Sequence, residues 1–149
     1  PQFKTKKGRL VYGGGGITPD IYSVFDLKLK EKSQSLLTHP KRLIFKYANE
    51  LKKDYEKFLS FNSFATFINK NTNVINQNIF IDWIKNSDED FDISFSDIQD
   101  DWEYIENRIF AELASVLWGK DYYYHVFLDK DIQFQTAVQN ISNAHNIMD

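Results

Sequence analysis

The stretch FSDIQDDWEYIENRIFAELASVLWG, residues 95–119, decides the fold class. Ser96 is followed three residues later by Gln99, a capping-box spacing that predicts a helix start, and acidic residues fill the first turn. Gly119 is well placed to end the same helix. Apolar residues recur between these two ends at three- and four-residue steps, on one face: Ile98, Trp102, Ile105, Ile109, Leu113, Val116 and Leu117. The pattern predicts one long amphipathic helix over residues 97–118.

Helical patterning continues on both sides of this stretch. Apolar residues at helical spacing predict a helix from residue 33 to about residue 51, with Pro40 in its first turns, where proline is tolerated. The asparagine-rich residues 69–78 favour turns, and residues 79–84 predict a short helix. Asp131 can cap a final helix. That helix would carry on one side Phe134, Val138, Ile141 and His145.

The N-terminal residues follow a different pattern. Leu10–Tyr12 and residues 17–24 flank four consecutive glycines, which predicts two short strands around a glycine turn. A phosphate-binding loop is excluded because no Gly-Lys-Ser/Thr follows the glycines and no helix begins there. The predicted fold class is therefore α+β and mainly α, with short strands within residues 1–32 and a helical domain over residues 33–149.

Composition and charge exclude several classes of protein. The chain has 149 residues, of which 42% are hydrophobic, enough for a buried core, and it has no cysteine for a disulfide or a thiolate metal site. No apolar run reaches the roughly 20 residues of a membrane span, and its first residues lack a signal-peptide pattern. We expect no membrane insertion by this segment.

The charges are unevenly distributed. Residues 1–60 contain 13 Lys or Arg against 6 Asp or Glu, a net +7, and residues 61–149 contain 5 against 15, a net −10, which together give −3. Because the basic residues are spread over a β-like stretch and a helix, we expect them to pack near the acidic part or to face solvent. No nucleic-acid partner is predicted.

An acidic loop gives the closest approach to a metal-binding motif. Asp88, Asp90 and Asp92 alternate like the first ligands of an EF-hand. Ile93 stands where that loop needs glycine, and Gln99 where it needs a bidentate glutamate. The sequence therefore predicts a solvated acidic loop ahead of a helix, with no metal.

No catalytic constellation is legible either. His39, His125 and His145 have no paired ligand spacing, and neither Gly-x-Ser-x-Gly nor Ser-x-x-Lys occurs, so no metal, cofactor or self-contained active site is predicted. Two aromatic clusters, Tyr122–Tyr124 and residues 58–67, could stack on bases or sugars. Their helical spacing favours a place in the core instead.

Two separated sets of residues resemble a known family. The first set is Phe3-Lys4-Thr5, Gly8-Arg9, Val11-Tyr12-Gly13-Gly14-Gly15-Gly16-Ile17 and Pro19-Asp20-Ile21. It resembles the end of the core domain in C-terminal processing, or tail-specific, serine peptidases, in which an aromatic-led strand, a Gly-Arg turn and a Gly-Ile-x-Pro-Asp close follow one another. The four-glycine form is similar to Bacteroidetes-type members. The second set, residues 105–116 with Leu117-Trp118-Gly119 and Tyr123-Tyr124, resembles the helix and Trp-Gly signature of their C-terminal extension.

The resemblance implies a periplasmic or cell-envelope peptidase that grips unstructured C-terminal segments through an upstream PDZ domain. It would cleave proteins near their C-termini with a serine nucleophile and a lysine general base. In the family, both catalytic residues precede the Gly-Arg turn, and this chain begins just before that turn. No catalytic residue carries over to this sequence, so we expect the chain alone to be inactive. The matched residues carry over as scaffold only.

Two hypotheses about the helical domain follow. In the first, it is a structural and regulatory appendage that packs on the peptidase core or a second subunit; its partners are the upstream core, the PDZ domain and the substrates of the parent protein. In the second, it is an autonomous binding module that recruits a substrate or adaptor. Burial of the aromatic residues would favour the first hypothesis, and a contiguous exposed patch the second. The residues concerned are Phe64, Phe67, Tyr122, Tyr123 and Tyr124.

The N-terminal strands carry a further expectation. Strands without a complete sheet leave unpaired backbone edges, which are prone to pair with other chains. We therefore expect residues 3–24 either to be poorly ordered or to associate with a neighbouring copy.

Overall fold

The computed structural model describes residues 1–6, 8–16, 19–24, 27–58, 64–69, 75–144 and 146. The chain is mainly helical with two short antiparallel strands near its N-terminus, which confirms the α+β, mainly α class. It divides into two compact units: a helical unit, Leu27–Lys130, and a terminal unit made of Pro1–Asp26 and Asp131–Asp149. The boundary after residue 32, between strands of a peptidase core and a helical domain, stays a prediction.

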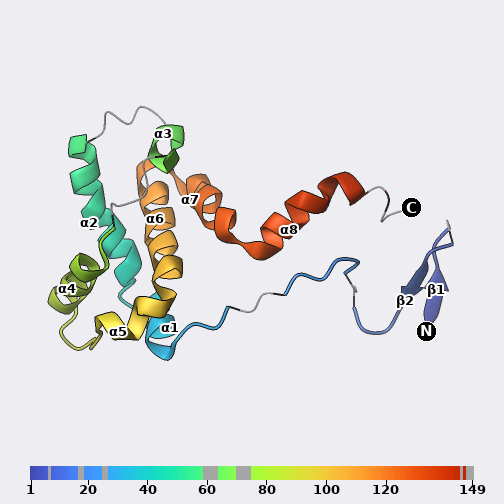
Figure 1. Ribbon diagram of the computed structural model, residues 1–149, viewed down its shortest axis with the longest axis horizontal. Helices are drawn as coiled ribbons and strands as arrows, with labels where there is room; N and C mark the ends of the chain where they lie inside the picture. Colours follow the sequence, from blue (N-terminus) through green and yellow to red (C-terminus); the bar gives the residue numbers. More distant parts are fainter. Residues whose placement is uncertain are drawn as a thin grey trace. The chain divides into compact units, whose positions relative to one another are not determined.

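The helical unit is built around one central helix. Its elements in chain order are α1 (Glu31–Leu37), α2 (Leu43–Phe58), α3 (Phe64–Asn69), α4 (Gln77–Ser87), α5 (Phe95–Ile98), the 3-10 turn η1 (Gln99–Asp101), α6 (Trp102–Trp118), α7 (Lys120–Phe127) and the 3-10 turn η2 (Leu128–Lys130). Helix α6 packs against both α2 and α7 (Figure 1). Helices α1 and α4 each pack against both α2 and α5.

The core of this unit follows from the apolar stripe of α6. Ile105, Ile109 and Leu113 are fully buried, as the helical spacing predicts. They join buried residues from the helices around them, among which are Leu36, Leu43, Ala48, Phe67, Phe80, Ile84 and Ile98. Each large side chain buried in this way contributes about 1.5–3 kcal/mol to folding.

The start of the long helix differs from the prediction. The expected helix over residues 97–118 is divided into α5, η1 and α6, and the box forms at Ser94 and Asp97 rather than at Ser96 and Gln99. The backbone N–H and the hydroxyl of Ser94 both donate to the Asp97 carboxylate, at 2.8 and 2.6 Å. Both serines have a suitable partner three residues later, but the charged carboxylate is the stronger acceptor. The predicted end is confirmed, because Gly119 is the C-cap of α6.

The predicted helix over residues 33–51 is also divided. Helix α1 ends at Leu37, and α2 begins at Leu43. Pro40 has no N–H to donate to the carbonyl four residues earlier, and it disfavours helical geometry at the residue before it. Arg42, with φ of 51°, then turns the chain into α2.

The predicted helix over residues 79–84 is confirmed and is longer than expected. Helix α4 spans Gln77–Ser87, and the Asn76 side chain caps it by accepting N–H donors from Asn78 and Ile79 at 2.9 and 3.2 Å. The predicted turns over residues 69–78 lie partly outside the described residues.

In the terminal unit, the strands pair differently from the prediction. Strand β1 (Gln2–Lys4) pairs antiparallel with β2 (Leu10–Tyr12), and Phe3 lies opposite Val11. The predicted partner, residues 17–24, forms no strand over its described part, residues 19–24. A hydrogen bond joins the chain just after β1 to the residue just before β2. The backbone N–H of Thr5 donates to the carbonyl of Arg9 at 2.9 Å.

The final helix follows the sequence prediction. Helix α8 (Ile132–Asn140) begins after Asp131, whose carboxylate accepts the N–H of Phe134 at 2.8 Å. The 3-10 turn η3 (Ile141–Asn143) continues it. His145, expected on the same face as Phe134, lies outside the described residues.

Candidate functional site

An ion pair brings together two parts of the peptidase-like motif. The guanidinium of Arg9 lies 2.8 and 3.1 Å from the two carboxylate oxygens of Asp20, so the Gly8-Arg9 turn and the Pro19-Asp20 segment meet in the terminal unit. Gly8 has φ of 91°, a conformation that glycine adopts without strain. The ion pair connects the two parts of the motif, and the scaffold role of these residues stays a prediction.

The glycine run begins with a close approach. A Cβ added at Gly13 would lie 2.6 Å from the ring atom Cε2 of Phe3, so only glycine lets this ring lie against the backbone. The N–H of Gly13 donates to the carbonyl of Pro1 at 2.9 Å. Gly14, Gly15 and Gly16 continue in a bend, and Ile17 lies outside the described residues.

The hairpin is largely uncovered. Phe3, Leu10 and Tyr12 are each more than half exposed, and the register places Phe3 on one face of the hairpin and the other two on the opposite face. Tyr22 and Val24, which follow the glycine run, are also exposed. A two-stranded hairpin is marginal by itself in water, and its edges are open to strand pairing. The hairpin therefore leaves both apolar side chains and backbone edges uncovered.

Helix α8 is held on one side by polar contacts. Gln133 donates to the carbonyl of Ser23 at 3.2 Å, and the hydroxyls of Ser23 and Thr136 lie 3.4 Å apart. A different face carries exposed apolar side chains: Phe134, Val138 and Ile141. The predicted one-sided arrangement of these three residues is present, and their stripe faces solvent.

Trp118 and Gly119, the second set of motif residues, lie in the helical unit. The Trp118 ring lies 5.8 Å from Phe64 and 4.7 Å from Phe67, both from α3. Gly119, with φ of 107°, separates α6 from α7. Their setting is that of structural residues at a helix junction.

The aromatic residues of the helical unit are mostly packed. Phe67 is buried and stacks on Phe110 with ring centres 4.2 Å apart. Phe64, Tyr122 and Tyr123 are half-buried against the core, and burial raises the pKa of Tyr123 to about 12. Phe67 confirms the predicted core role, and the three half-buried rings pack against the core. The predicted cluster over residues 58–67 lies partly outside the described residues. Only Tyr124 of the five discriminating residues is exposed.

The acidic loop differs from the prediction at Asp88. This carboxylate is buried, with Lys41 Nζ at 2.9 Å and His39 Nε2 at 3.6 Å, whereas Asp90 and Asp92 are exposed as expected. The hydrogen bond from Lys41 holds the pKa of Asp88 below its ordinary value. The loop is therefore attached to the turn between α1 and α2. The Lys41 ammonium group contacts the Asp88 carboxylate, which we expected to face solvent.

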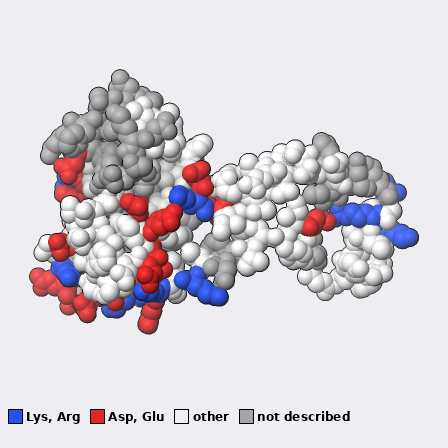
Figure 2. Space-filling view, in the orientation of Figure 1, with Lys and Arg blue, Asp and Glu red and all other residues white. Residues whose placement is uncertain are grey.

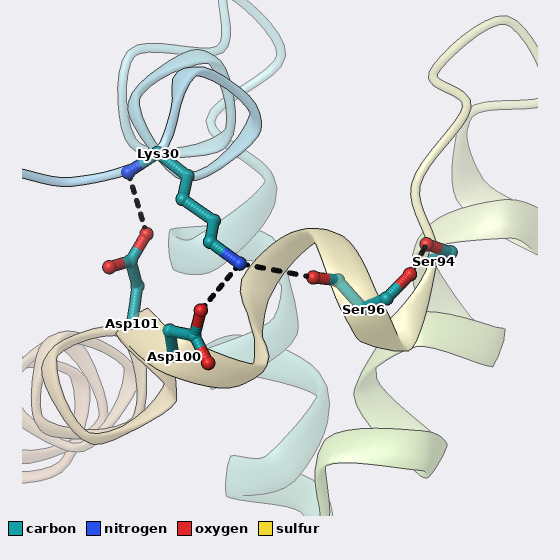
Figure 3. A network of polar contacts seen from close by, with 5 residues as sticks. All are labelled: Lys30, Ser94, Ser96, Asp100 and Asp101. Carbon is teal, nitrogen blue, oxygen red and sulfur yellow. Dashed lines mark hydrogen bonds and ion pairs between the residues drawn. The ribbon is translucent and has the colours of Figure 1, made fainter.

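The acidic surface of the helical unit is partly neutralised by lysines. Residues 82–106 contain ten acidic residues and one basic residue, and acidic side chains form several groups on the face of this unit seen in Figure 2. Lys30 lies beside Asp100 and Asp101 and reaches the Ser96 carbonyl (Figure 3). The expectation that basic residues pack near the acidic part is confirmed here. Sequence reasoning identified the opposite charges but not these partners, which lie about 70 residues apart.

The described residues contain neither a metal-ligand cluster nor a membrane-spanning helix. They contain no group of three or more His, Cys, Asp or Glu side chains that could hold a metal ion. None of their helices is long and apolar enough to cross a membrane. Comparison with family models, curated proteins and solved structures finds no match to this chain.

Proposed function

We propose that this chain is the C-terminal part of a tail-specific serine endopeptidase of the periplasm or cell envelope. In this proposal the N-terminal hairpin docks on the sheet of the peptidase core, which supplies the serine and the lysine. The helical unit serves as a structural and regulatory appendage. The chain alone is inactive.

The observation that carries the proposal is the uncovered hairpin within the family-like motif. Phe3, Leu10 and Tyr12 expose apolar surface on both faces of two three-residue strands, while the Arg9–Asp20 pair holds the motif in shape. A segment with this shape gains most by completing a larger sheet, because its open edges and its apolar faces would then be covered. Because the segment resembles the last strands of a peptidase core, the sheet of that core is the partner that we propose.

The aromatic packing supports the appendage role over the binding module. Phe64, Phe67, Tyr122 and Tyr123 are committed to the core of the helical unit, so they offer little contiguous surface for recruiting a substrate. The exposed stripe of Phe134, Val138 and Ile141 on α8 is the observation that favours the alternative.

The test uses the complete reading frame that encodes this chain. We expect its product to cleave a peptide with an apolar C-terminus. That activity should be lost when the catalytic serine or the catalytic lysine, both encoded before Pro1, is replaced by alanine. The 149-residue chain alone should not cleave the peptide. A reading frame without such a serine and lysine would overturn the proposal.

Removal of residues 33–149 separates the two roles. An appendage that shapes the core predicts a changed kcat/KM even for a short peptide. A recruiting module predicts an unchanged rate for the short peptide and a loss of cleavage only for whole-protein substrates. The matched control Tyr124→Ala changes an exposed aromatic residue outside the core and should leave short-peptide cleavage unchanged.

A further inference from the structure

Helix α8 and the turn η3 lie in the longest stretch of the chain without a charged side chain. No Lys, Arg, Asp or Glu occurs between Asp131 and Asp149, although these four types make up 26% of all residues. Gln, Asn, Ser and Thr fill most polar positions of the stretch instead. Such a surface neither attracts nor repels charged groups strongly, so its apolar side chains and their spacing decide what it binds.

Two sides of α8 have different surroundings. One side faces Ser23 within the terminal unit, because Gln133 donates to the Ser23 carbonyl and the hydroxyl of Thr136 lies 3.4 Å from that of Ser23. Another side carries three apolar residues that we call the α8 stripe: Phe134, Val138 and Ile141, which are 41%, 45% and 67% exposed. Steps of four and three residues place them in one row along the helix. The α8 stripe is therefore uncovered within the terminal unit.

The composition of α8 argues against two kinds of partner. A helix that lies on a membrane surface typically carries Lys or Arg on its polar face, and α8 carries none. A partner with a strongly charged surface finds no opposite charge on α8 either. The partner that fits is neutral and offers an apolar stripe of matching length. A second α8 is a surface of this chemistry.

The spacing of the α8 stripe makes it complementary to itself. In a two-fold antiparallel pair of helices, a residue that precedes the axis meets one that follows it by as many positions on the other copy. The midpoint between Phe134 and Ile141 falls beside Val138. In such a pair, Phe134 of each copy packs on Ile141 of the other, and the two Val138 side chains lie between them. Ala137 is exposed and next to Val138 in sequence, and its small side chain lets the two helices approach.

Charge selects the antiparallel direction. The Asp131 carboxylate caps the beginning of α8. A parallel pair would bring two Asp131 carboxylates and two like helix ends side by side, which is unfavourable. In an antiparallel pair centred beside Val138, the two carboxylates lie about 20 Å apart along the helices at 1.5 Å per residue.

We infer that two copies of this chain associate through their α8 helices, in an antiparallel pair centred beside Val138. Three side chains over about two helical turns bury far less than the roughly 1,200 Å² of a stable dimer, so the association is weak and depends on protein concentration. The pairing involves only residues of this chain, and its test does not depend on peptidase activity.

Cysteine cross-linking tests the pairing directly, because the chain has no cysteine of its own. In the 149-residue chain, Val138→Cys should form a disulfide-linked dimer under mild oxidation. The matched control is Ile132→Cys, on the same helix, because Ile132 is 66% exposed and lies on the side opposite Phe134. We expect about five times as much dimer from Val138→Cys on non-reducing electrophoresis, because pairing raises the effective concentration of its thiols.

A mixture of two variants gives the direction of the pair. Phe134→Cys and Ile141→Cys should link to each other more than either links to itself, and intact mass distinguishes the three products. Preferential self-linking of Phe134→Cys, as in a parallel pair, would overturn the inference. Equal yields from Val138→Cys and Ile132→Cys would overturn it as well, and are the result expected if the α8 stripe binds a different protein.

Sedimentation velocity over a range of concentrations measures the association without a covalent link. Phe134→Ser should weaken it about tenfold, and Ile132→Ser should leave it unchanged. Leu10→Ser is a second control, because the exposed hairpin offers another surface for pairing. Circular dichroism checks that each variant is folded. Loss of association in Leu10→Ser but not in Phe134→Ser would place the contact at the hairpin and overturn the inference.

Discussion

At the scale of single residues, Asp88 is a buried carboxylate in the helical unit with a lysine beside it. Its carboxylate is buried and binds Lys41, so Asp88→Asn removes the negative charge and leaves the lysine only a neutral amide oxygen as acceptor. We expect the thermal midpoint at pH 7 to fall by a few degrees, measured by circular dichroism. The matched control Asp90→Asn changes an exposed carboxylate of the same loop and should have almost no effect.

The pH dependence identifies the cause of that loss. The pKa of folded Asp88 is lowered from an ordinary value of 3.8, so its contribution to stability is fully present above pH 3.8 and disappears as the pH falls through the folded value. The difference in midpoint between Asp88→Asn and the unsubstituted protein should therefore shrink toward zero in acid. A difference that is as large in acid as at neutral pH would mean that packing, not charge, is responsible.

Gly119 gives a second prediction at this scale. Its φ of 107° is one that side chains with a Cβ rarely adopt, and it stands between α6 and α7. We expect Gly119→Ala to lower the free energy of unfolding by about 1–3 kcal/mol, measured in urea. Gly15 has open space and no such backbone angle, so Gly15→Ala should change this free energy by less than about 0.5 kcal/mol. Equal effects of the two substitutions would contradict the argument.

At the scale of elements, the attachment of α3 to α6 rests on stacked aromatic rings. Phe67 is buried and lies 4.2 Å from the Phe110 ring, nearly parallel to it. We expect Phe67→Ala to cost about 3–5 kcal/mol of unfolding free energy, because it leaves a cavity between two helices. Phe95→Ala removes an exposed ring from α5 and should cost less than about 1 kcal/mol. A small effect at Phe67 would show that α3 contributes little to the cooperative unit.

At the scale of the whole molecule, several carboxylates make contacts that favour their charged form. We therefore expect the folded state to lose stability in acid. Hydrogen bonds from Ser94 lower the pKa of Asp97, and those from Lys130 lower that of Glu103. These groups and Asp88 stabilise the folded state above their unfolded pKa values, so stability should fall as the pH drops below about 4. Burial raises the pKa of Glu106, which acts in the opposite direction and reduces the loss. Thermal midpoints measured across the acid range would check the net fall, and a rising midpoint would contradict it.

Alkali should also destabilise the molecule, for the opposite reason. Burial raises the pKa of Tyr47 and raises that of Tyr123 to about 12, from an ordinary value of 10.0. A raised pKa stabilises the folded state below the unfolded value and loses that contribution as the pH rises. In an absorbance titration of the phenolate, we expect these two tyrosines to ionise after the exposed ones, together with unfolding. Ionisation of all tyrosines in one step near pH 10 in the folded protein would contradict this expectation.

Local patterns predicted the features that depend on neighbours in sequence. The mainly helical class, the buried stripe of α6, the Gly119 end and the Asp131 cap all follow from spacing and capping within a few residues. The motif around Gly8 and Arg9 was likewise visible as a pattern. The ion pair between Arg9 and Asp20 could not be predicted in this way, because the identity of a residue does not specify which other residue it contacts.

The sequence by itself therefore determined the mainly helical class, the end of α6 at Gly119 and the start of α8 after Asp131, because helices form from contacts three and four residues apart. The break between α1 and α2, the bounds of α4 and the helix α7 did not follow from it. Tertiary structure decided which strand pairs with Leu10–Tyr12, which serine caps α5, that Asp88 is buried and that Lys30 meets Asp100. Each of these outcomes is a choice between chemically similar partners. Such a choice is settled by which groups the packed helices bring within bonding distance and by how much charge must be neutralised when water leaves.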